Sequence, residues 1–356
     1  MRLLPSGTIP RTLLFGGVLI LITVAGSNFW LKKSFADTVF VPVPHCVNEK
    51  SMSFPCWKEK YERSTRELGV AASLVSMKAA YAHNSYVASQ CHQLTHVVGN
   101  MSAEMHSADI AEAFTGGDAF CWSGYYHGVV ERAVGLVGRD NIVAKLNSLC
   151  AKIPGKQSYS FDYYNCVHGL GHGLMSITRN ELFESLALCD NLTDNWEQQS
   201  CQGGVFMENV MADNRNHFTK YLKKDDLTYP CNAVDEKYKQ QCYLMQTSYM
   251  LTKNGYDFND VFRRCADADL NYRNTCAESA GRDASGNSIS DTKRTLATCG
   301  LALYDDQYQH CLEGAVKDFV SYFHDDKRAH ELCAGAREKF RFGCQNTAES
   351  YYSTFK

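Results

Sequence analysis

Apolar residues recur at helical spacing in two stretches of the chain. One stripe lies within residues 65–90 and consists of Val70, Leu74, Met77 and Tyr81. Another runs from Leu182 to Leu188 and ends at Cys189. Asp194 and Glu197 have the spacing of a capping box, which predicts a new helix that carries Cys201 near its start. The pattern therefore predicts antiparallel helical hairpins in which the two cysteines of a hairpin face each other.

The cysteines repeat in register with this pattern. From Cys150 onward they form close pairs, and the second members of successive pairs, counted from Cys121, recur at a mean step of about 37 residues. When the segments that follow these second members are aligned, four of the seven carry glycine at the third place: Gly124, Gly169, Gly204 and Gly314. A small residue there lets a neighbouring helix approach closely. We expect an all-α fold, a helical-hairpin repeat array of the α-solenoid type.

Sixteen cysteines and the absence of CxxC spacing favour disulfides over metal–thiolate sites. Each bridge over a loop of this size is expected to contribute about 3 kcal/mol. The last two pairs below follow by elimination. The expected bridges are Cys150–Cys166, Cys189–Cys201, Cys231–Cys242, Cys265–Cys276, Cys299–Cys311, Cys333–Cys344, Cys91–Cys121 and Cys46–Cys56.

This layout resembles the disulfide-stapled Sel1-like helical repeats of secreted bacterial proteins, and more broadly tetratricopeptide-like arrays, in architecture only. The Sel1 consensus is absent, and the cysteine spacing differs. The resemblance therefore implies a stack of helical hairpins and implies no function or site residue.

The N-terminus has the composition of an export segment. Arg2 and Arg11 precede a hydrophobic run over residues 12–30, and Lys32 and Lys33 follow it. The run is intermediate in length between a signal peptide and a membrane-spanning helix, so a cleaved signal and an uncleaved anchor both remain open. We expect an export segment at 1–36, a tether with a local cysteine pair at 37–64, and a repeat domain at 65–356. That domain divides into a histidine-rich half (65–215) and a scaffold half (216–356).

Histidines gather in the first three cysteine-bearing helices. His127, His172 and Met207 all lie six places after an aligned cysteine, and Glu208 follows Met207. If the hairpins stack, these side chains become neighbours. The candidate metal ligands are His92, His96, His127, His168 and His172, with Glu131 and Glu208 as further ligands or as the general base.

Imidazole with carboxylate suits zinc or non-haem iron, and imidazole with thioether suits copper. The sequence thus predicts a transition metal, Zn, Fe or Cu. Two alternatives remain open. The histidines could serve as acids, bases or ligand donors in a metal-free polar cleft, or they could be structural residues bonded between stacked helices.

The later repeats lose the histidines. Glu278 and Glu313 take the place of His168, while Arg282 and Lys317 take the place of His172. A spacing of four predicts ion pairs within each helix. Any chemistry is therefore expected in the N-terminal half.

Two functions from different classes follow. The first is an exported or membrane-anchored metal-dependent protein, an oxidoreductase or a hydrolase. The second is a non-catalytic solenoid that binds a protein, a peptide or an envelope glycan. The net charge of −3 over 356 residues argues against nucleic acid as a partner. We expect a periplasmic or extracellular location, with the N-terminal segment in the membrane if it is not cleaved.

Overall fold

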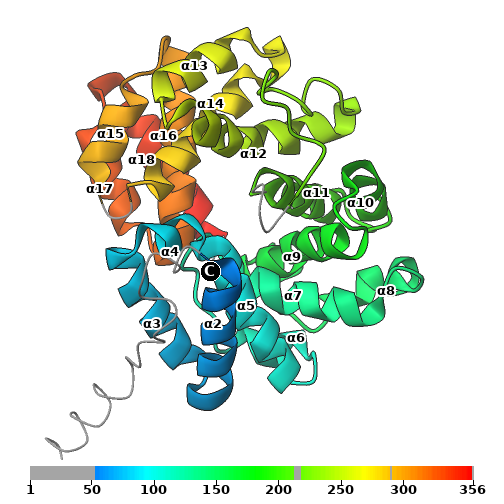
Figure 1. Ribbon diagram of the computed structural model, residues 1–356. Helices are drawn as coiled ribbons and strands as arrows, with labels where there is room; N and C mark the ends of the chain where they lie inside the picture. Colours follow the sequence, from blue (N-terminus) through cyan, green and yellow to red (C-terminus); the bar gives the residue numbers. More distant parts are fainter. Residues whose placement is uncertain (1–52, 212–217, 289–290, 355–356) are drawn as a thin grey trace, which may run out of the picture.

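Helices make up all of the regular structure in the described part of the chain. The computed structural model describes residues 53–211, 218–288 and 291–354, and these contain no strand (Figure 1). The first half contains α2 (Phe54–Leu68), α3 (Val70–His83), α4 (Ser85–Ser89), α5 (Cys91–Met105), α6 (Ile110–Phe114), α7 (Gly124–Val137), α8 (Ile142–Leu149), α9 (Phe161–Ile177), α10 (Leu182–Cys189) and α11 (Asn195–Val210). The second half contains α12 (Glu236–Asn254), α13 (Phe258–Asp267), the short 3₁₀ helix η3 (Leu270–Tyr272), α14 (Arg273–Gly286), α15 (Thr292–Cys299), α16 (Asp305–Phe323), α17 (Lys327–Gly335) and α18 (Glu338–Ser353). The expected all-helical class is confirmed.

Disulfides connect segments that are close together along the chain. The seven bridges are Cys91–Cys121, Cys150–Cys166, Cys189–Cys201, Cys231–Cys242, Cys265–Cys276, Cys299–Cys311 and Cys333–Cys344. Six of them are pairs expected from the register, and Cys91–Cys121 is the pair expected by elimination. The eighth expected pair includes Cys46, which lies outside the described residues. So many bridges indicate that the chain folds in an oxidising, exported environment.

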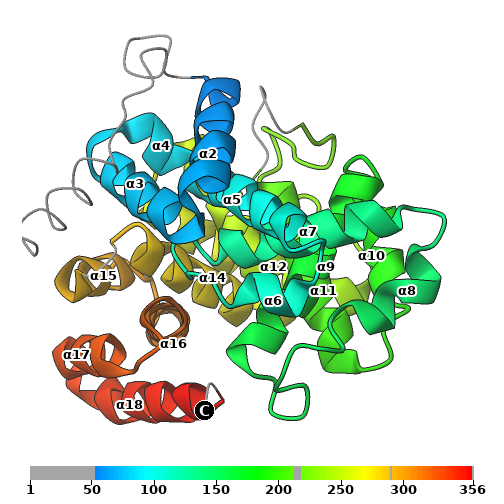
Figure 2. The ribbon, with the colours of Figure 1, turned by 90° about the horizontal axis from the view of Figure 1, so that it is seen from below.

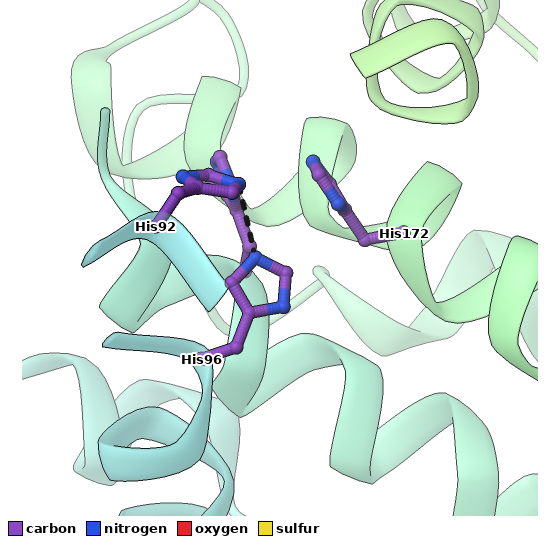
Figure 3. A group of neighbouring side chains, drawn as sticks. His92, His96 and His172 are labelled. Carbon is purple, nitrogen blue, oxygen red and sulfur yellow. Dashed lines mark hydrogen bonds between the residues drawn. The ribbon is translucent and has the colours of Figure 1, made fainter. Parts of the chain in front are cut away.

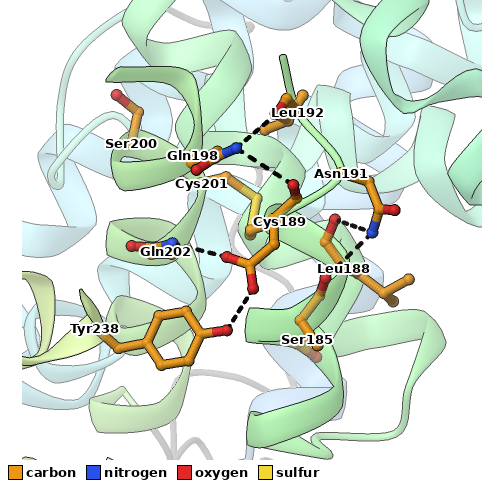
Figure 4. Close-up of a disulfide and its surroundings, with 12 residues drawn as sticks. Ser185, Leu188, Cys189, Asn191, Leu192, Gln198, Ser200, Cys201, Gln202 and Tyr238 are labelled. Atoms are coloured by element: carbon orange, nitrogen blue, oxygen red, sulfur yellow. Dashed lines mark hydrogen bonds between the residues drawn. A yellow bond between two sulfur atoms is a disulfide. The ribbon is translucent and has the colours of Figure 1, made fainter. Parts of the chain in front are cut away.

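The hairpin of α10 and α11 illustrates why these segments fold locally (Figure 4). The side chain of Asp194 accepts hydrogen bonds from the backbone N–H groups of Trp196 and Glu197, so it caps α11 as expected. Gln198 donates to the backbone carbonyls of Asp190 and Leu192 in the turn. The bridge between the helices thus has a hydrogen-bonded turn beside it.

Helix α5 and seven of the longer helices that follow it pack side by side, in the order in which they occur along the chain. The contacts join α5 to α7, α7 to α9, α9 to α11, α11 to α12, α12 to α14, α14 to α16 and α16 to α18. At the crossing of α9 and α11, a Cβ added to Gly171 or Gly204 would overlap a backbone carbonyl of the other helix. The backbones therefore touch there, as the glycine register predicted for Gly204. Gly169 differs, because it faces the side chain of Val130.

Helices from the first part of the chain also meet one from the last part, because α3 and α5 line a small pocket together with α16. Figure 1 shows cyan helices next to orange ones, and Figure 2 shows the red α18 further away from the blue and cyan helices. Trp122, which precedes α7, packs against Gly286 at the end of α14. The rings of Phe161 and His324 have centroids 4.2 Å apart. The succession of helices therefore curves back on itself and encloses the interior that holds the histidines.

The first described helix lies partly within the segment expected to be a tether. Helix α2 starts at Phe54, and its side chains Trp57 and Tyr61 are buried in the core. The hydrophobic run at 12–30 lies outside the described residues. Among the residues that are described, no helix combines the length and the apolar character needed to cross a membrane.

Gly204→Ala is expected to lower the free energy of unfolding by about 1–3 kcal/mol, because the added methyl group would overlap the carbonyl oxygen of His168. Gly135→Ala is the matched control in α7, where an added Cβ meets nothing within 4 Å. The control should be neutral or stabilising by up to about 1 kcal/mol. Urea unfolding with the disulfides intact measures both. Equal stability of the two variants would contradict the close helix crossing.

Candidate metal centre

Two of the candidate histidines lie on α5. His92 and His96 are one turn apart and point to the same side of the helix (Figure 3). Both are buried, at 3% and 5% exposure. Their Nε2 atoms are 3.1 Å apart. Spacing of four along a helix, which the sequence displays, is the reason that these two rings meet.

His127 on α7 and His172 on α9 complete the group. Their rings stack with centroids 4.4 Å apart, and the His172 ring is 5.6 Å from His92 and 5.0 Å from His96. One ligand atom from each of the four histidines lies within 4.8 Å of the others. This buried cluster, here called the four-histidine cluster, could hold a metal ion.

His168, the fifth candidate, stands beside the cluster and outside the group of four. Its ring centroid is 4.8 Å from that of His127. Its Nε2 lies 3.3 Å from the sulfur of Met207, and its Nδ1 lies 3.2 Å from the hydroxyl of Tyr164. The aligned position of Met207 thus brings a thioether next to the histidines.

The outward-facing ring nitrogens have hydrogen-bond acceptors. Nδ1–H of His92 donates to the backbone carbonyl of Cys121 at 2.8 Å. Nδ1 of His96 lies 3.1 Å from Oε2 of Glu131, and Nδ1 of His172 lies 2.5 Å from Oε2 of Glu208. A carboxylate or carbonyl behind a histidine fixes the ring and its tautomer, as around metal-bound imidazoles.

These hydrogen-bond partners determine whether the nitrogens that face the centre of the cluster carry a proton or a lone pair. If Nδ1 of a neutral ring carries the proton, its Nε2 carries a lone pair. The Nε2 atoms of His92 and His96, which are 3.1 Å apart, would then point their lone pairs at each other. Such a contact needs a proton or a cation between the two rings. Two nitrogens bound to one tetrahedral ion are roughly 3.3 Å apart, given metal–nitrogen bonds of about 2.0–2.1 Å.

Electrostatics differ among the rings. Burial, followed by the charge of His96, lowers the pKa of His92 to about 3. Burial and the neighbouring histidines lower the pKa of His127 well below its usual value. Burial also acts to lower the pKa of His96, but the hydrogen bond and charge of Glu131 and the charge of Glu208 outweigh it, so that pKa is raised. Of these three rings, His96 is therefore the one that protonates most readily.

His127 provides an independent sign that the cluster fits a cation. It is 2% exposed, and neither of its ring nitrogens has a hydrogen-bond partner. Buried polar atoms without a partner cost about 1–3 kcal/mol each and are rare in folded proteins. A metal ion would satisfy one of these nitrogens directly.

A cavity of about 300 Å³ adjoins the cluster, and His127 and His168 form part of its wall. This volume is at the lower end of the range for small-molecule sites. Its aromatic wall residues are Trp122, Tyr164, Trp196 and Tyr351. Sequence patterns did not identify these residues, because they come from four separate segments with no shared motif.

Charged residues of the later repeats line the same cavity, and their pairing differs from the expected one. Lys317 forms an ion pair with Glu278 at 2.6 Å, across α16 and α14. Arg282 pairs with its neighbour Asp283 at 2.9 Å. The expectation of pairs within each helix was therefore wrong for Glu278 and Lys317. Glu278, Arg282 and Lys317 stand in the alignment where the first half of the chain has histidines. The same helix face therefore points toward the interior in the first and the second half of the chain.

Comparison with known protein families, with curated proteins and with solved structures found no match. No residue role can therefore be taken from a relative. What the protein does has to be inferred from the four-histidine cluster, the cavity and the disulfides.

Asp318 in the cavity wall is expected to make stability depend on pH. Burial raises the pKa of Asp318 to about 7, although Ser285 donates a hydrogen bond to it. The unfolded carboxyl group ionises near pH 4, so folding is progressively disfavoured as pH rises from about 4 to about 7. Asp318→Asn removes this penalty. Its free energy of unfolding relative to wild type should increase by about 1–2 kcal/mol between pH 5 and pH 8, after allowing for the solvent in the cavity.

The exposed residue Asp140 offers the matched control, Asp140→Asn. Urea unfolding of the three proteins at both pH values, with the disulfides intact, gives the comparison. If the free energy of unfolding of Asp318→Asn relative to wild type stays constant between the two pH values, or increases toward acid pH, the result would contradict the assigned environment of this carboxyl group.

Proposed function

We propose that this chain is an exported metalloprotein whose four-histidine cluster binds one divalent transition metal ion, Zn, Fe or Cu. The observation that carries the proposal is the 3.1 Å contact between Nε2 of His92 and Nε2 of His96, whose Nδ1 atoms both face acceptors. The metal ion replaces the proton that holds this pair together in its absence. All-imidazole ligation suits each of the three metals.

The two carboxylates act on the metal through the histidines. Glu131 and Glu208 hold Nδ1 of His96 and His172. From there they orient the rings and raise their basicity as ligands. Their two negative charges also balance a divalent ion held by neutral imidazoles. We therefore assign them this positioning role in place of the general-base role considered from sequence.

The cavity beside His127 supports chemistry on a small molecule. Metal-dependent hydrolysis requires a bound water and a base positioned to accept its proton. The carboxylates nearest the cluster are committed to histidines, so with iron or copper, the redox-active metals of the three, we favour an oxidoreductase over a hydrolase. The metal supplies the redox or Lewis-acid chemistry, while the protein positions the ion, excludes bulk water and holds the substrate against the aromatic wall.

For the architecture, we propose a repeat array of stapled hairpins in which each aligned second helix contributes one inward face. The succession of contacts from α5 to α18 supports this arrangement. Such an array would bring histidines that are far apart in sequence onto one point, as stacking of equivalent helices requires.

Metal content tests the proposal most simply. Full-length protein, purified with its disulfides intact and incubated with zinc, should bind one equivalent tightly. His127→Ala should weaken zinc binding by more than about 100-fold, because it removes a ligand. His83→Ala, at an exposed position in α3, should leave the affinity unchanged. Plasma mass spectrometry gives stoichiometry, and competition with a chromophoric chelator gives affinity.

Less than about one equivalent of any of the three metals, unaffected by His127→Ala, would contradict the proposal. That outcome would favour the non-catalytic function, in which the histidines are structural and the protein binds a protein, a peptide or a glycan. Circular dichroism of each variant separates loss of metal from loss of fold.

Glu208→Gln tests the positioning role. The substitution keeps the size of the side chain but removes its charge, so zinc affinity should fall by about 10–100-fold without loss of stoichiometry. Glu184→Gln is a matched control at the surface, where Glu184 pairs with Arg139. An unchanged affinity in Glu208→Gln would show that the carboxylate does not support the site.

A further inference from the structure

Beside the four-histidine cluster lies another pair of atoms that bind metals. Nε2 of His168 on α9 is 3.3 Å from Sδ of Met207 on α11. Both side chains are almost fully buried, at 2% and 6% exposure. Both also contribute to the wall of the cavity.

The distance matches two ligands of one ion. A nitrogen at about 2.0 Å and a sulfur at about 2.3 Å from a metal lie roughly 3.3–3.5 Å apart at angles near tetrahedral. Imidazole with thioether is a soft donor set that selects Cu(I). Nδ1 of His168 lies 3.2 Å from the phenol oxygen of Tyr164, which can accept a hydrogen bond from an N–H at that position. Nε2 is then left with a lone pair that faces the thioether.

Because the nitrogen–copper–sulfur angle would be far from linear, the ion needs a third donor atom. His127 is the neighbour with a ring nitrogen available for this. Its ring centroid is 4.8 Å from that of His168, and both of its nitrogens lack hydrogen-bond partners. One nitrogen belongs to the four-histidine group, which leaves the other for a second ion. With both ions bound, the ring would release its remaining N–H proton to solvent, and each of its two nitrogens would be available to one ion.

We propose that His168, Met207 and His127 form a second metal site, selective for Cu(I), in the wall of the cavity beside the four-histidine cluster. The inference builds on the proposed four-histidine centre, with which it shares His127. The second ion would face the space where a small molecule binds.

The test uses the full-length protein with disulfides intact and zinc in the four-histidine cluster. Tetrakis(acetonitrile)copper(I) is added without oxygen, and no reductant is needed. We expect one further equivalent of Cu(I), and X-ray absorption should show one sulfur at about 2.3 Å. In the described part of the chain no cysteine is free, so that sulfur reports a thioether.

Met207→Leu keeps the size of the side chain and removes the sulfur. It should abolish the copper–sulfur signal and weaken Cu(I) binding by at least about tenfold, while the zinc content stays at one equivalent. Met245→Leu is the matched control in the same cavity wall, because the sulfur of Met245 faces the guanidinium of Arg282 at 2.5 Å. This variant should retain both the signal and the affinity.

Three results would overturn the inference: no Cu(I) beyond the zinc, a copper–sulfur signal that persists in Met207→Leu, or copper that displaces zinc one for one without a sulfur ligand. In each case the contact of His168 with Met207 would be an N–H donating to the thioether. Failure of the four-histidine centre is distinguishable, because the wild-type protein would then retain no zinc before copper is added.

Discussion

Imidazole nitrogens in the interior of a protein must meet a proton, a hydrogen-bond partner or a metal, and here four of the rings turn toward one point. The outer nitrogens of His92, His96 and His172 face a carbonyl and two carboxylates. Those acceptors direct the lone pairs inward. The result is a buried group of nitrogen lone pairs. A single proton can bind to only some of these lone pairs, whereas a divalent cation can bind to all of them.

The packing of the helices brings these rings together. A disulfide links the start of α5 to the segment before α7, and close contact at Gly99 and Gly128 brings α5 and α7 together backbone to backbone. Imidazoles have short side chains, so rings from three helices can share one point only where the backbones approach this closely. Helices from both halves of the chain line the cavity beside His127.

Much of this could be predicted from the sequence, because it follows local spacing. The register of the cysteines predicted six of the seven disulfides, and elimination predicted Cys91–Cys121. The position six residues after each aligned cysteine predicted which helix face points inward. Spacing of four predicted that His92 and His96 share a side of α5. Features that depend on the exact rotation of one helix against another could not be predicted. The displacement of His168 toward Met207 and the pairing of Lys317 with Glu278 across helices are of this kind. The aromatic cavity wall likewise draws on distant segments that carry no common signal.

The central claim is that an ion belongs among the four imidazoles. Anomalous X-ray diffraction from crystals of the zinc-loaded, disulfide-intact protein, recorded on both sides of the zinc absorption edge, tests it most directly. The account predicts one anomalous peak at about 2.0–2.1 Å from a ring nitrogen of each of His92, His96, His127 and His172. Zinc found only at surface sites, with Nε2 of His92 and Nε2 of His96 still in direct contact, would contradict it.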